Sequence, residues 1–245
     1  MKNNPTSSGS SDTLNIRPLG HIHTDFPEKF GIPRQSGLVP SLQAYITFEK
    51  EFQNPDCFRG IEQFSHLWLI WGFSENQDKG WSPTVRPPRL GGNVHTGVFA
   101  SRSPFRPNPL GLSSVRLEGI SLNESDCGKT TSPILYISGA DLMDGTPIYD
   151  IKPYIPVSDN HPDARGSFSD AARSHRLTVH CDYELLSVVS PDKRQALLEV
   201  LALDPRPAYH HNPERIYGMD FGDWCVRFCV DESELYVREI IQNKK

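Results

Sequence analysis

The sequence contains no long hydrophobic run. Its longest apolar segment, residues 66–73 (HLWLIWGF), has only the length of a β-strand, whereas a membrane-spanning helix needs about 18 apolar residues. The first residues, MKNNPTSSGSSD, lack the apolar stretch of a secretory signal. We therefore expect a protein that has no membrane span and acts in the cytoplasm.

Cysteine is scarce, and several familiar catalytic motifs are missing. The five cysteines are scattered and form no C-x-x-C pair, which is typical of reduced thiols rather than of disulfides or structural zinc. The sequence also lacks a G-x-S-x-G elbow, a P-loop and a G-x-G-x-x-G fingerprint after a strand. These absences disfavour hydrolases with a nucleophile elbow, NTPases and methyltransferases with a Rossmann fold.

Proline, in contrast, is abundant, with 21 among 245 residues. Because proline interrupts helices and internal strands, we expect strands joined by ordered loops. The apolar patterns predict strands near residues 14–22, 44–48, 66–73, 96–100, 112–122, 134–138, 148–151, 177–189, 224–230 and 235–241. The segment 66–73 is apolar enough to be buried on both sides. One helix is predicted at residues 191–201, with Ser190 as its N-cap and Pro191 at its first position.

These elements predict a mainly β protein of two domains. Hydrophobic residues make up 37% of the chain, which is enough to bury a core. We expect a disordered tail at residues 1–13, a β-barrel domain at residues 14–165 and a smaller α+β C-terminal domain at residues 166–245.

Positive charge is concentrated in one segment of an acidic chain. Residues 79–117 contain six basic residues and no acidic one, which leaves a net charge of −11 on the remainder. The same segment holds six prolines and five glycines, so its loops can be irregular and still stiff. Ordered loops that carry arginine suit the recognition of phosphate or carboxylate. From charge alone, a solvated basic loop explains the segment equally well.

Two histidine groups raise the question of a metal site. His21 and His23 would point to one face of a strand, and His210 is followed by His211. Neither group has an acidic or cysteine partner at a diagnostic spacing, so we favour chance histidines over a zinc site and expect no metal.

Six motifs occur in the order and spacing of one known family: KFGIPRQ, GIEQFSHLW, PTVRPPRLGGN, GVFASRSPFRPNPLG, DLMDGTPIYDIKPY and DPRPAY. On these motifs the sequence resembles the TrmO (TsaA-like) family of S-adenosylmethionine-dependent tRNA methyltransferases, densely over residues 15–160 and beyond them only through DPRPAY. The resemblance implies a single-sheet β-barrel that works as a homodimer. It also implies methylation of N6 of threonylcarbamoyladenosine at position 37, next to the anticodon.

The resemblance carries over a set of cofactor-binding residues. Matching motif positions imply that S-adenosylmethionine is bound by Pro33, Arg34, Gln35, His66, Leu67, Arg102, Leu112, Asp144, Gly145, Thr146 and Pro147. The implied macromolecular substrate is the anticodon stem-loop of tRNA.

The chemistry of the reaction suggests further roles. The lone pair of N6 is delocalised into the adenine ring, so we expect the Asn108 side-chain oxygen and the carbonyl of Pro107 or Pro109 to accept the N6 protons. The threonylcarbamoyl group carries a carboxylate that a cationic side chain can recognise. The predicted catalytic set is therefore Asn108, Arg106 and Lys152, and the predicted substrate-binding residues are Arg86, Arg89 and Tyr149.

Two other functions remain open at this point. The protein is a non-catalytic RNA-binding β-barrel module if the basic loop serves only to bind phosphate. It is a small-molecule hydrolase if His21 and His23 hold a metal. Only a methyltransferase predicts saturable binding of S-adenosylmethionine that the substitution Arg102→Ala removes.

Overall fold

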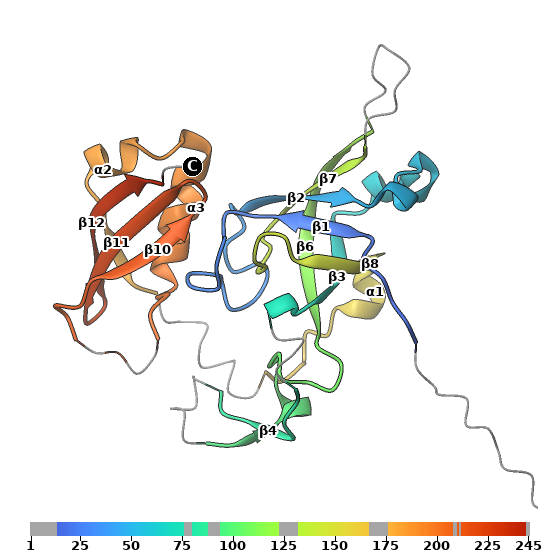
Figure 1. Cartoon of the computed structure of the whole chain (residues 1–245), viewed down its shortest axis with the longest axis horizontal. Coiled ribbons are helices and arrows are strands. Elements are labelled where there is room, and N and C mark those ends of the chain that lie inside the picture. Colours follow the sequence, from blue (N-terminus) through green and yellow to red (C-terminus); the bar gives the residue numbers. More distant parts are fainter. Residues whose placement is uncertain are drawn as a thin grey trace, which may run out of the picture.

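A computed structural model describes residues 14–75, 80–87, 94–122, 132–166, 176–207, 210 and 212–243. Two separate hydrophobic cores divide these residues into a β-barrel unit and an α+β unit (Figure 1). The predicted fold class, a mainly β protein with a single-sheet barrel and a smaller α+β part, is confirmed. The tail predicted at residues 1–13 lies outside the described residues.

The barrel is one closed sheet of antiparallel strands in the order β1-β2-β7-β6-β3-β8. The bounds are β1 (Gly20–His23), β2 (Gln43–Phe48), β3 (His66–Gly72), β6 (Leu110–Ser121), β7 (Ile134–Ser138) and β8 (Pro147–Pro153). Alternate residues such as Ile22, Ile46 and Leu69 fill the interior, as the period of two along a strand requires. Closure leaves the sheet with no free edge.

Some predicted strands differ from the observed ones. β1 begins at Gly20 rather than at residue 14, and the strand expected at 96–100 is only β5 (Thr96–Gly97), which pairs with β4 (Thr84–Val85). Segment 66–73 is not buried on both sides: in β3, Leu67 and Leu69 point inward while His66 and Trp68 lie on the outer face. The short helix α1 (Pro156–Asp159) partly covers that face, and Trp68 Nε1 donates to Asp159 Oδ2 at 2.8 Å.

The α+β unit is a sheet of four strands packed against a helix. Its strands run in the order β10 (Tyr217–Phe221), β11 (Trp224–Asp231), β12 (Glu234–Gln242) and β9 (Thr178–His180), and β9 is parallel to β12. The predicted helix is confirmed as α3 (Pro191–Ala202), with Ser190 at the N-cap position, although its side chain makes no capping hydrogen bond. No helix in the described ranges is long and apolar enough to cross a membrane.

The strand predicted at residues 177–189 is correct only at its start, where β9 lies, and wrong from residue 181 on. The chain leaves β9 after His180 and forms a second helix, α2 (Tyr183–Ser187). Leu185, Leu186 and Val189 pack against the core of the α+β unit. A strand would turn the adjacent Leu185 and Leu186 to opposite faces, whereas the short helix lets both pack against this core, and Val189 follows just after the helix ends.

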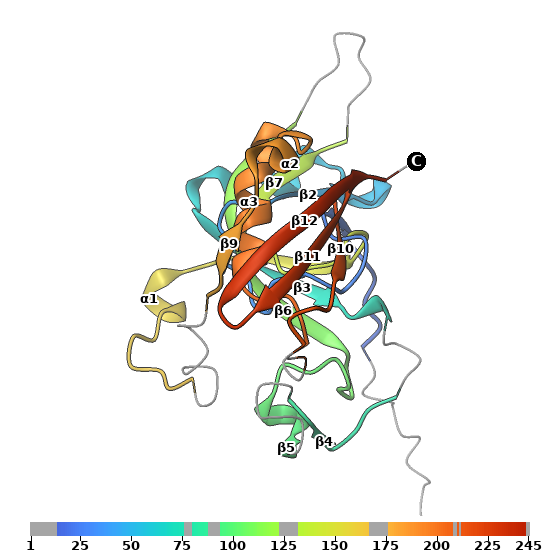
Figure 2. The ribbon, with the colours of Figure 1, turned by 90° about the vertical axis from the view of Figure 1, so that its left-hand side faces the viewer.

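A long loop, residues 24–42, joins the two units. It leaves the barrel after β1, crosses to the α+β unit and returns as β2 (Figures 1 and 2). Phe26, Val39 and Leu42 belong to the core of the α+β unit although they precede that unit by more than a hundred residues. We call residues 24–42 the strap.

A second projection extends from the barrel end near β3 and β6. We call its described residues, 80–87 and 94–109, the lobe; it lies away from the α+β unit in both views (Figures 1 and 2). The Val98 amide donates to the Pro83 carbonyl at 3.0 Å, and the Phe73 amide donates to the Pro109 carbonyl at 3.0 Å. These bonds close the proline-rich segment on itself and fix it to the end of β3.

Candidate active site

A cavity of about 220 Å³ opens at the barrel end where β3 ends and β8 begins. Its walls come from β3, from the turn before β8, from the strap and from the lobe; they include Trp71, Phe73, Pro104, Asp141, Leu142 and Thr146. A larger cavity, about 270 Å³, lies between Phe30 and Tyr217 and is lined by none of the predicted cofactor, catalytic or substrate-binding residues, whereas Thr146 lines the smaller one. We therefore place the candidate site in the smaller cavity.

Asp141 brings a carboxylate to this mostly apolar wall. Ser113 Oγ donates to Asp141 Oδ1 at 2.6 Å, and Trp71 Nε1 in turn donates to Ser113 Oγ at 3.0 Å. Burial raises the pKa of Asp141, while the Ser113 hydrogen bond, the charge of Arg102 and a backbone hydrogen bond from Ser36 act in the opposite direction. An ionised carboxylate that is held out of water in this way favours a cationic ligand.

Two of the predicted cofactor residues meet beside Asp141. Arg102 Nη1 donates a hydrogen bond to Gln35 Oε1, which joins the lobe to the strap. Pro33 and Arg34 precede Gln35 on the strap; Pro33 is buried and Arg34 is exposed. The structure thus brings Gln35 and Arg102, 67 residues apart in sequence, to one side of the cavity.

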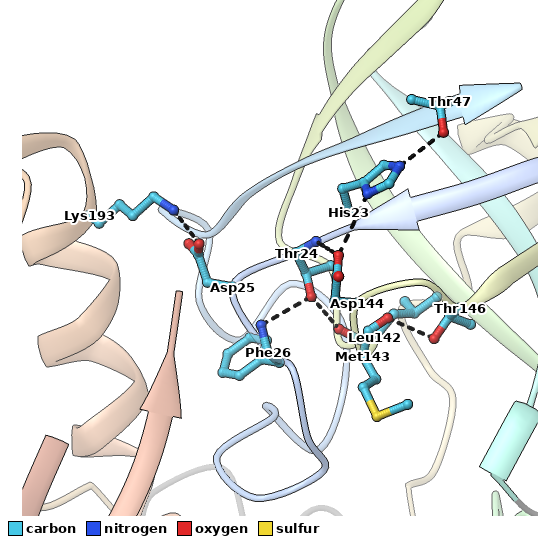
Figure 3. Close-up of polar contacts among 10 residues, drawn as sticks. All are labelled: His23, Thr24, Asp25, Phe26, Thr47, Leu142, Met143, Asp144, Thr146 and Lys193. Carbon is cyan, nitrogen blue, oxygen red and sulfur yellow. Dashed lines mark hydrogen bonds and ion pairs between the residues drawn. The ribbon is translucent and has the colours of Figure 1, made fainter. Parts of the chain in front are cut away.

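In the predicted turn at residues 144–147, Thr146 lines the cavity and Asp144 ties the turn to the strap (Figure 3). The Asp144 side chain accepts a hydrogen bond from the Thr24 amide at 3.0 Å, and the Asp144 amide donates to the Phe26 carbonyl at 2.8 Å. Gly145 has a φ of 73°, which the tight turn requires and which glycine adopts without strain. Thr146 is buried and lines the cavity, and Pro147 begins β8.

Three predicted cofactor residues lie away from this cavity. Leu67 is buried inside the barrel. His66 begins β3 at the end opposite to the cavity, about 20 Å away at the rise of a β-strand. Leu112 lies on the outer face of β6, opposite Ile70, with 51% of its surface exposed. A single chain therefore does not bring these three residues to the other predicted positions.

The predicted catalytic residues are dispersed. Arg106 Nη1 donates to the carbonyls of Val98 and Ser101 at 3.1 and 2.7 Å, so this guanidinium braces the lobe. Asn108 is exposed near the end of the lobe. Lys152 lies on β8 opposite Trp68 and forms an ion pair with Asp150 at 2.9 Å.

The residues predicted to bind substrate occupy the lobe and the barrel end. Arg86 is exposed, and its Nε donates to His95 Nε2 at 3.0 Å. Tyr149 packs over Gly72, where an added Cβ would lie 2.6 Å from the tyrosine ring. Arg89 lies outside the described residues.

The histidine groups have other partners. His21 Nδ1 lies 3.4 Å from Glu49 Oε1, and His23 lies 3.7 Å from Asp144 and 2.9 Å from Thr47 Oγ1 (Figure 3). The ranges that the structure describes contain no group of three or more His, Cys, Asp or Glu residues that could hold a metal ion. His211 lies outside those ranges.

Sequence reasoning missed Asp141, Ser113 and Trp71. Asp141 is the first residue of the DLMDGTP motif, but the sequence assigns a cofactor role only to the Asp144-Gly145 turn and the two residues after it. Trp71 belongs to the apolar run of β3, and Ser113 is a small polar residue at an inward position of β6. A serine that alternates with the inward-facing Val115 and Leu117 of β6 was the signal available in the sequence, because a buried hydroxyl needs a partner.

Comparison with known proteins identifies relatives along nearly the whole chain. Family models for the tRNA-methyltransferase O N-terminal domain and the TrmO C-terminal domain match residues 21–160 and 174–243. A tRNA (adenine(37)-N6)-methyltransferase of Escherichia coli is 42% identical over 229 residues, which are 90% of this chain and 95% of that protein. One from Eikenella corrodens is 42% identical over 73% of this chain and 97% of its own length. A crystal structure of TrmO from Pseudomonas aeruginosa has a TM-score of 0.72 at 31% identity, covering 94% of this chain and 99% of its own.

Proposed function

The chain belongs to the TrmO family, and we propose that it methylates N6 of threonylcarbamoyladenosine at position 37 of tRNA in the cytoplasm. Membership of this family makes it an S-adenosylmethionine-dependent tRNA methyltransferase. The proposal adds the identity of the nucleoside, the place of the cofactor and the roles of individual residues.

The proposal depends most on the Asp141 carboxylate, which is partly buried, accepts the Ser113 hydroxyl and lines a cavity with apolar walls. S-adenosylmethionine combines an adenine with positively charged sulfonium and amino groups, so its chemistry fits a cavity with apolar walls and one desolvated acid. Asp141 would pair with the positive charge, while Trp71 and Phe73 supply flat apolar surface. Gln35 and Arg102 would close the strap side of the site, and Thr146 the turn side.

Methyl transfer requires a site that holds both reactants in a fixed alignment. The cofactor supplies a methyl group that its sulfonium makes electrophilic, and the charge disperses as the amine attacks, so alignment matters more than stabilisation of an anion. Holding both reactants in line contributes roughly 7 to 11 kcal/mol in favourable cases. The Trp71 ring packs directly over Gly111, where an added Cβ would lie 2.2 Å from it. That contact fixes the wall against which a reactant would be aligned.

The lobe supplies groups for the incoming adenine. We assign the Asn108 side-chain oxygen and the Pro107 carbonyl as acceptors for the N6 protons. The Pro109 carbonyl already accepts the Phe73 amide at 3.0 Å, so it is the weaker candidate. Arg106 acts by holding the backbone around them, because its guanidinium is bonded to the carbonyls of Val98 and Ser101. Lys152 would bind the threonylcarbamoyl carboxylate only if substrate extends to the outer face of β8.

The surface of the lobe suits unpaired RNA. Trp81 and Phe99 are 57% and 78% exposed, and Arg86 and Arg102 lie on the same lobe. Between residues 80 and 117 the sequence has no acidic residue. Exposed aromatic rings beside arginines bind single-stranded nucleic acid by stacking and by contact with phosphate. We therefore assign the lobe to the anticodon loop of tRNA.

We further propose that the active form is a homodimer. The exposed Leu112 and the partly exposed His66 share the outer face of β3 and β6. A second copy docked there would cover the exposed Leu112 side chain and the open side of the His66 ring, which the chain's own Tyr154 contacts on one side. Sedimentation of wild type as a dimer, and of Leu112→Asp as a monomer, is the expected result; a wild-type monomer that is fully active contradicts the proposal.

Calorimetric titration with S-adenosylmethionine tests the function. Wild type should bind the cofactor saturably, and Arg102→Ala, which removes the bond to Gln35, should weaken binding by about tenfold with the fold intact. Transfer to tRNA that carries the threonylcarbamoyl group should far exceed transfer to tRNA that lacks it. Binding of tRNA without any binding of cofactor would instead support the RNA-binding module, and equal activity on both tRNAs would contradict the proposed nucleoside.

A further inference from the structure

The tripeptide Thr24-Asp25-Phe26 links the two units of the chain (Figure 3). Its first and last residues bind the turn before β8. The Thr24 amide donates to Asp144 Oδ1 at 3.0 Å, the Thr24 hydroxyl donates to the Leu142 carbonyl at 3.1 Å, and the Phe26 carbonyl accepts the Asp144 amide. Leu142 lines the cavity, so the tripeptide contacts a residue of the cavity wall.

The middle residue of the tripeptide binds the other unit. The Asp25 carboxylate forms an ion pair with Lys193 Nζ of α3, and the Asp25 carbonyl accepts the Gly222 amide at 2.7 Å. Asp25 is 8% exposed, and the neighbouring Phe26 ring meets Phe221 edge-on at 5.7 Å between centroids. Burying an ionised carboxylate costs free energy unless it is paired with a cation. The ion pair with Lys193 therefore fixes the position of the Asp25 side chain.

A second anchor lies farther along the strap. Gly31 has a φ of 96°, and a Cβ at this position would lie 2.3 Å from Met219 Sδ of β10. Phe30 lies parallel to Phe228, with ring centroids 6.5 Å apart. Four residues after Gly31, the strap reaches the Gln35–Arg102 bond beside Asp141. The α+β unit therefore holds the strap at two points, residues 25–26 and 30–31, and the strap residues Lys29 and Ile32 next to the second point line the cavity.

We propose that Lys193, acting through Asp25, is a positioning residue for the cofactor site, so that the α+β unit sets the affinity of the barrel cavity for S-adenosylmethionine. The inference rests on the proposed function of that cavity. Neither Lys193 nor Asp25 lines the cavity. Their effect is transmitted by Thr24 and Phe26 to the turn that contains Leu142 and Asp144.

The test compares four variants of the full-length protein with wild type. Lys193→Met should weaken S-adenosylmethionine binding by about tenfold, within the range typical of coupling between sites, and should leave tRNA affinity unchanged. Lys193→Arg keeps the charge and should restore most of the affinity. Asp25→Asn with Lys193→Met leaves no unpaired buried charge, so it should fold and still bind the cofactor weakly. Lys50→Met replaces an exposed lysine of the barrel unit and should bind like wild type.

Hydrogen exchange separates positioning from a merely structural role. Because coupling is reciprocal, saturating cofactor should slow exchange of the Gly222 amide, which donates to Asp25, and Lys193→Met should abolish this slowing. The Thr178 amide, bonded to the Ser233 carbonyl within the α+β unit, serves as the control and should not respond. If folded Lys193→Met and the double variant bind cofactor as wild type does, the positioning role is wrong. A wild-type protein that binds no cofactor contradicts the proposed function itself.

Discussion

At the scale of single residues, the Asp141 carboxyl is expected to affect cofactor binding and folding stability in opposite directions. Burial raises the pKa of its carboxyl, so the folded chain holds the proton more tightly than the unfolded chain does. Stability from this group is therefore lost as the pH rises through the pKa of the folded state. Ionisation of Asp141 therefore costs stability at a pH above that pKa, and a cationic ligand beside the carboxylate would offset the cost.

The variant Asp141→Asn should therefore bind cofactor more weakly and be more stable than wild type. We expect the variant to lose cofactor affinity by about ten- to a hundredfold, the worth of a buried charge-assisted contact. Its melting temperature at pH 7 should exceed that of wild type by a few degrees, and the difference should shrink as the pH is lowered through the pKa of Asp141. Thermal melts across pH and calorimetry measure the two effects; unchanged cofactor affinity removes Asp141 from the site.

Asn108 tests the chemical step at the same scale. Asn108→Ala should bind cofactor and tRNA normally, because the side chain is exposed and no bond of the cavity wall depends on it. Its turnover should fall by about ten- to a hundredfold if the amide oxygen accepts an N6 proton in the transition state. Single-turnover methylation measures this step, and a wild-type rate shows that Asn108 has no part in it.

At the scale of elements, β6 carries one glycine packed against the Trp71 ring of the cavity wall and one with open space beside it. A Cβ on Gly111 would meet the Trp71 ring at 2.2 Å, whereas nothing lies within 4 Å of a Cβ on Gly119. Gly111→Ala should cost about 1 to 3 kcal/mol of stability and weaken cofactor binding, because it displaces the ring that donates to Ser113. Gly119→Ala is the matched control. Denaturant unfolding and tryptophan fluorescence report both changes, and equal behaviour of the two variants contradicts this account of the wall.

The lobe is the element assigned to RNA. Trp81→Ala and Phe99→Ala should each weaken tRNA binding by about tenfold, as expected for the loss of one stacked base, and leave cofactor affinity unchanged. Tyr183→Ala removes an aromatic ring of similar exposure from α2 and should have no effect. Gel-shift titrations at several salt concentrations measure the affinities. If both lobe variants bind tRNA like wild type, RNA does not stack on this surface.

Local sequence patterns are sufficient to predict some of the strands and one helix. Strands β2, β7 and β8 and helix α3 follow from local alternation and from Pro191, because their neighbours in space agree with their own propensities. Residues 181–189 did not follow, since Leu185 and Leu186 both pack against the core of the α+β unit through the short helix α2. β10 was missed although Tyr217, Met219 and Phe221 alternate as a strand should.

At the scale of the whole molecule, the motifs identified the family but could not give the relation of the two units. Gln35 and Arg102 were predicted as members of one site, and the structure joins them. His66 and Leu112 were predicted for the same site and lie on the outer face. Motif order along a chain holds no information about which side of a barrel a residue occupies. The pairing of Asp25 with Lys193 likewise depends on residues 168 positions apart.

Charge is the other property of the whole molecule. The chain is acidic overall, with a formal net charge of −5, yet the lobe segment is free of acidic residues. A polyanionic tRNA should therefore approach the lobe end of the barrel and be repelled elsewhere. Its affinity should fall steeply with salt because phosphate contacts release counterions.

The central claim is that the barrel cavity holds a methyl donor in line with N6 of threonylcarbamoyladenosine. Incubation of the purified protein with isotope-labelled S-adenosylmethionine and threonylcarbamoylated tRNA, followed by mass spectrometry of the nucleosides, tests it most directly. We expect one labelled methyl group on N6 of that nucleoside, and loss of the product with Asp141→Asn. Label on any other nucleoside, or undiminished product from the variant, would contradict it.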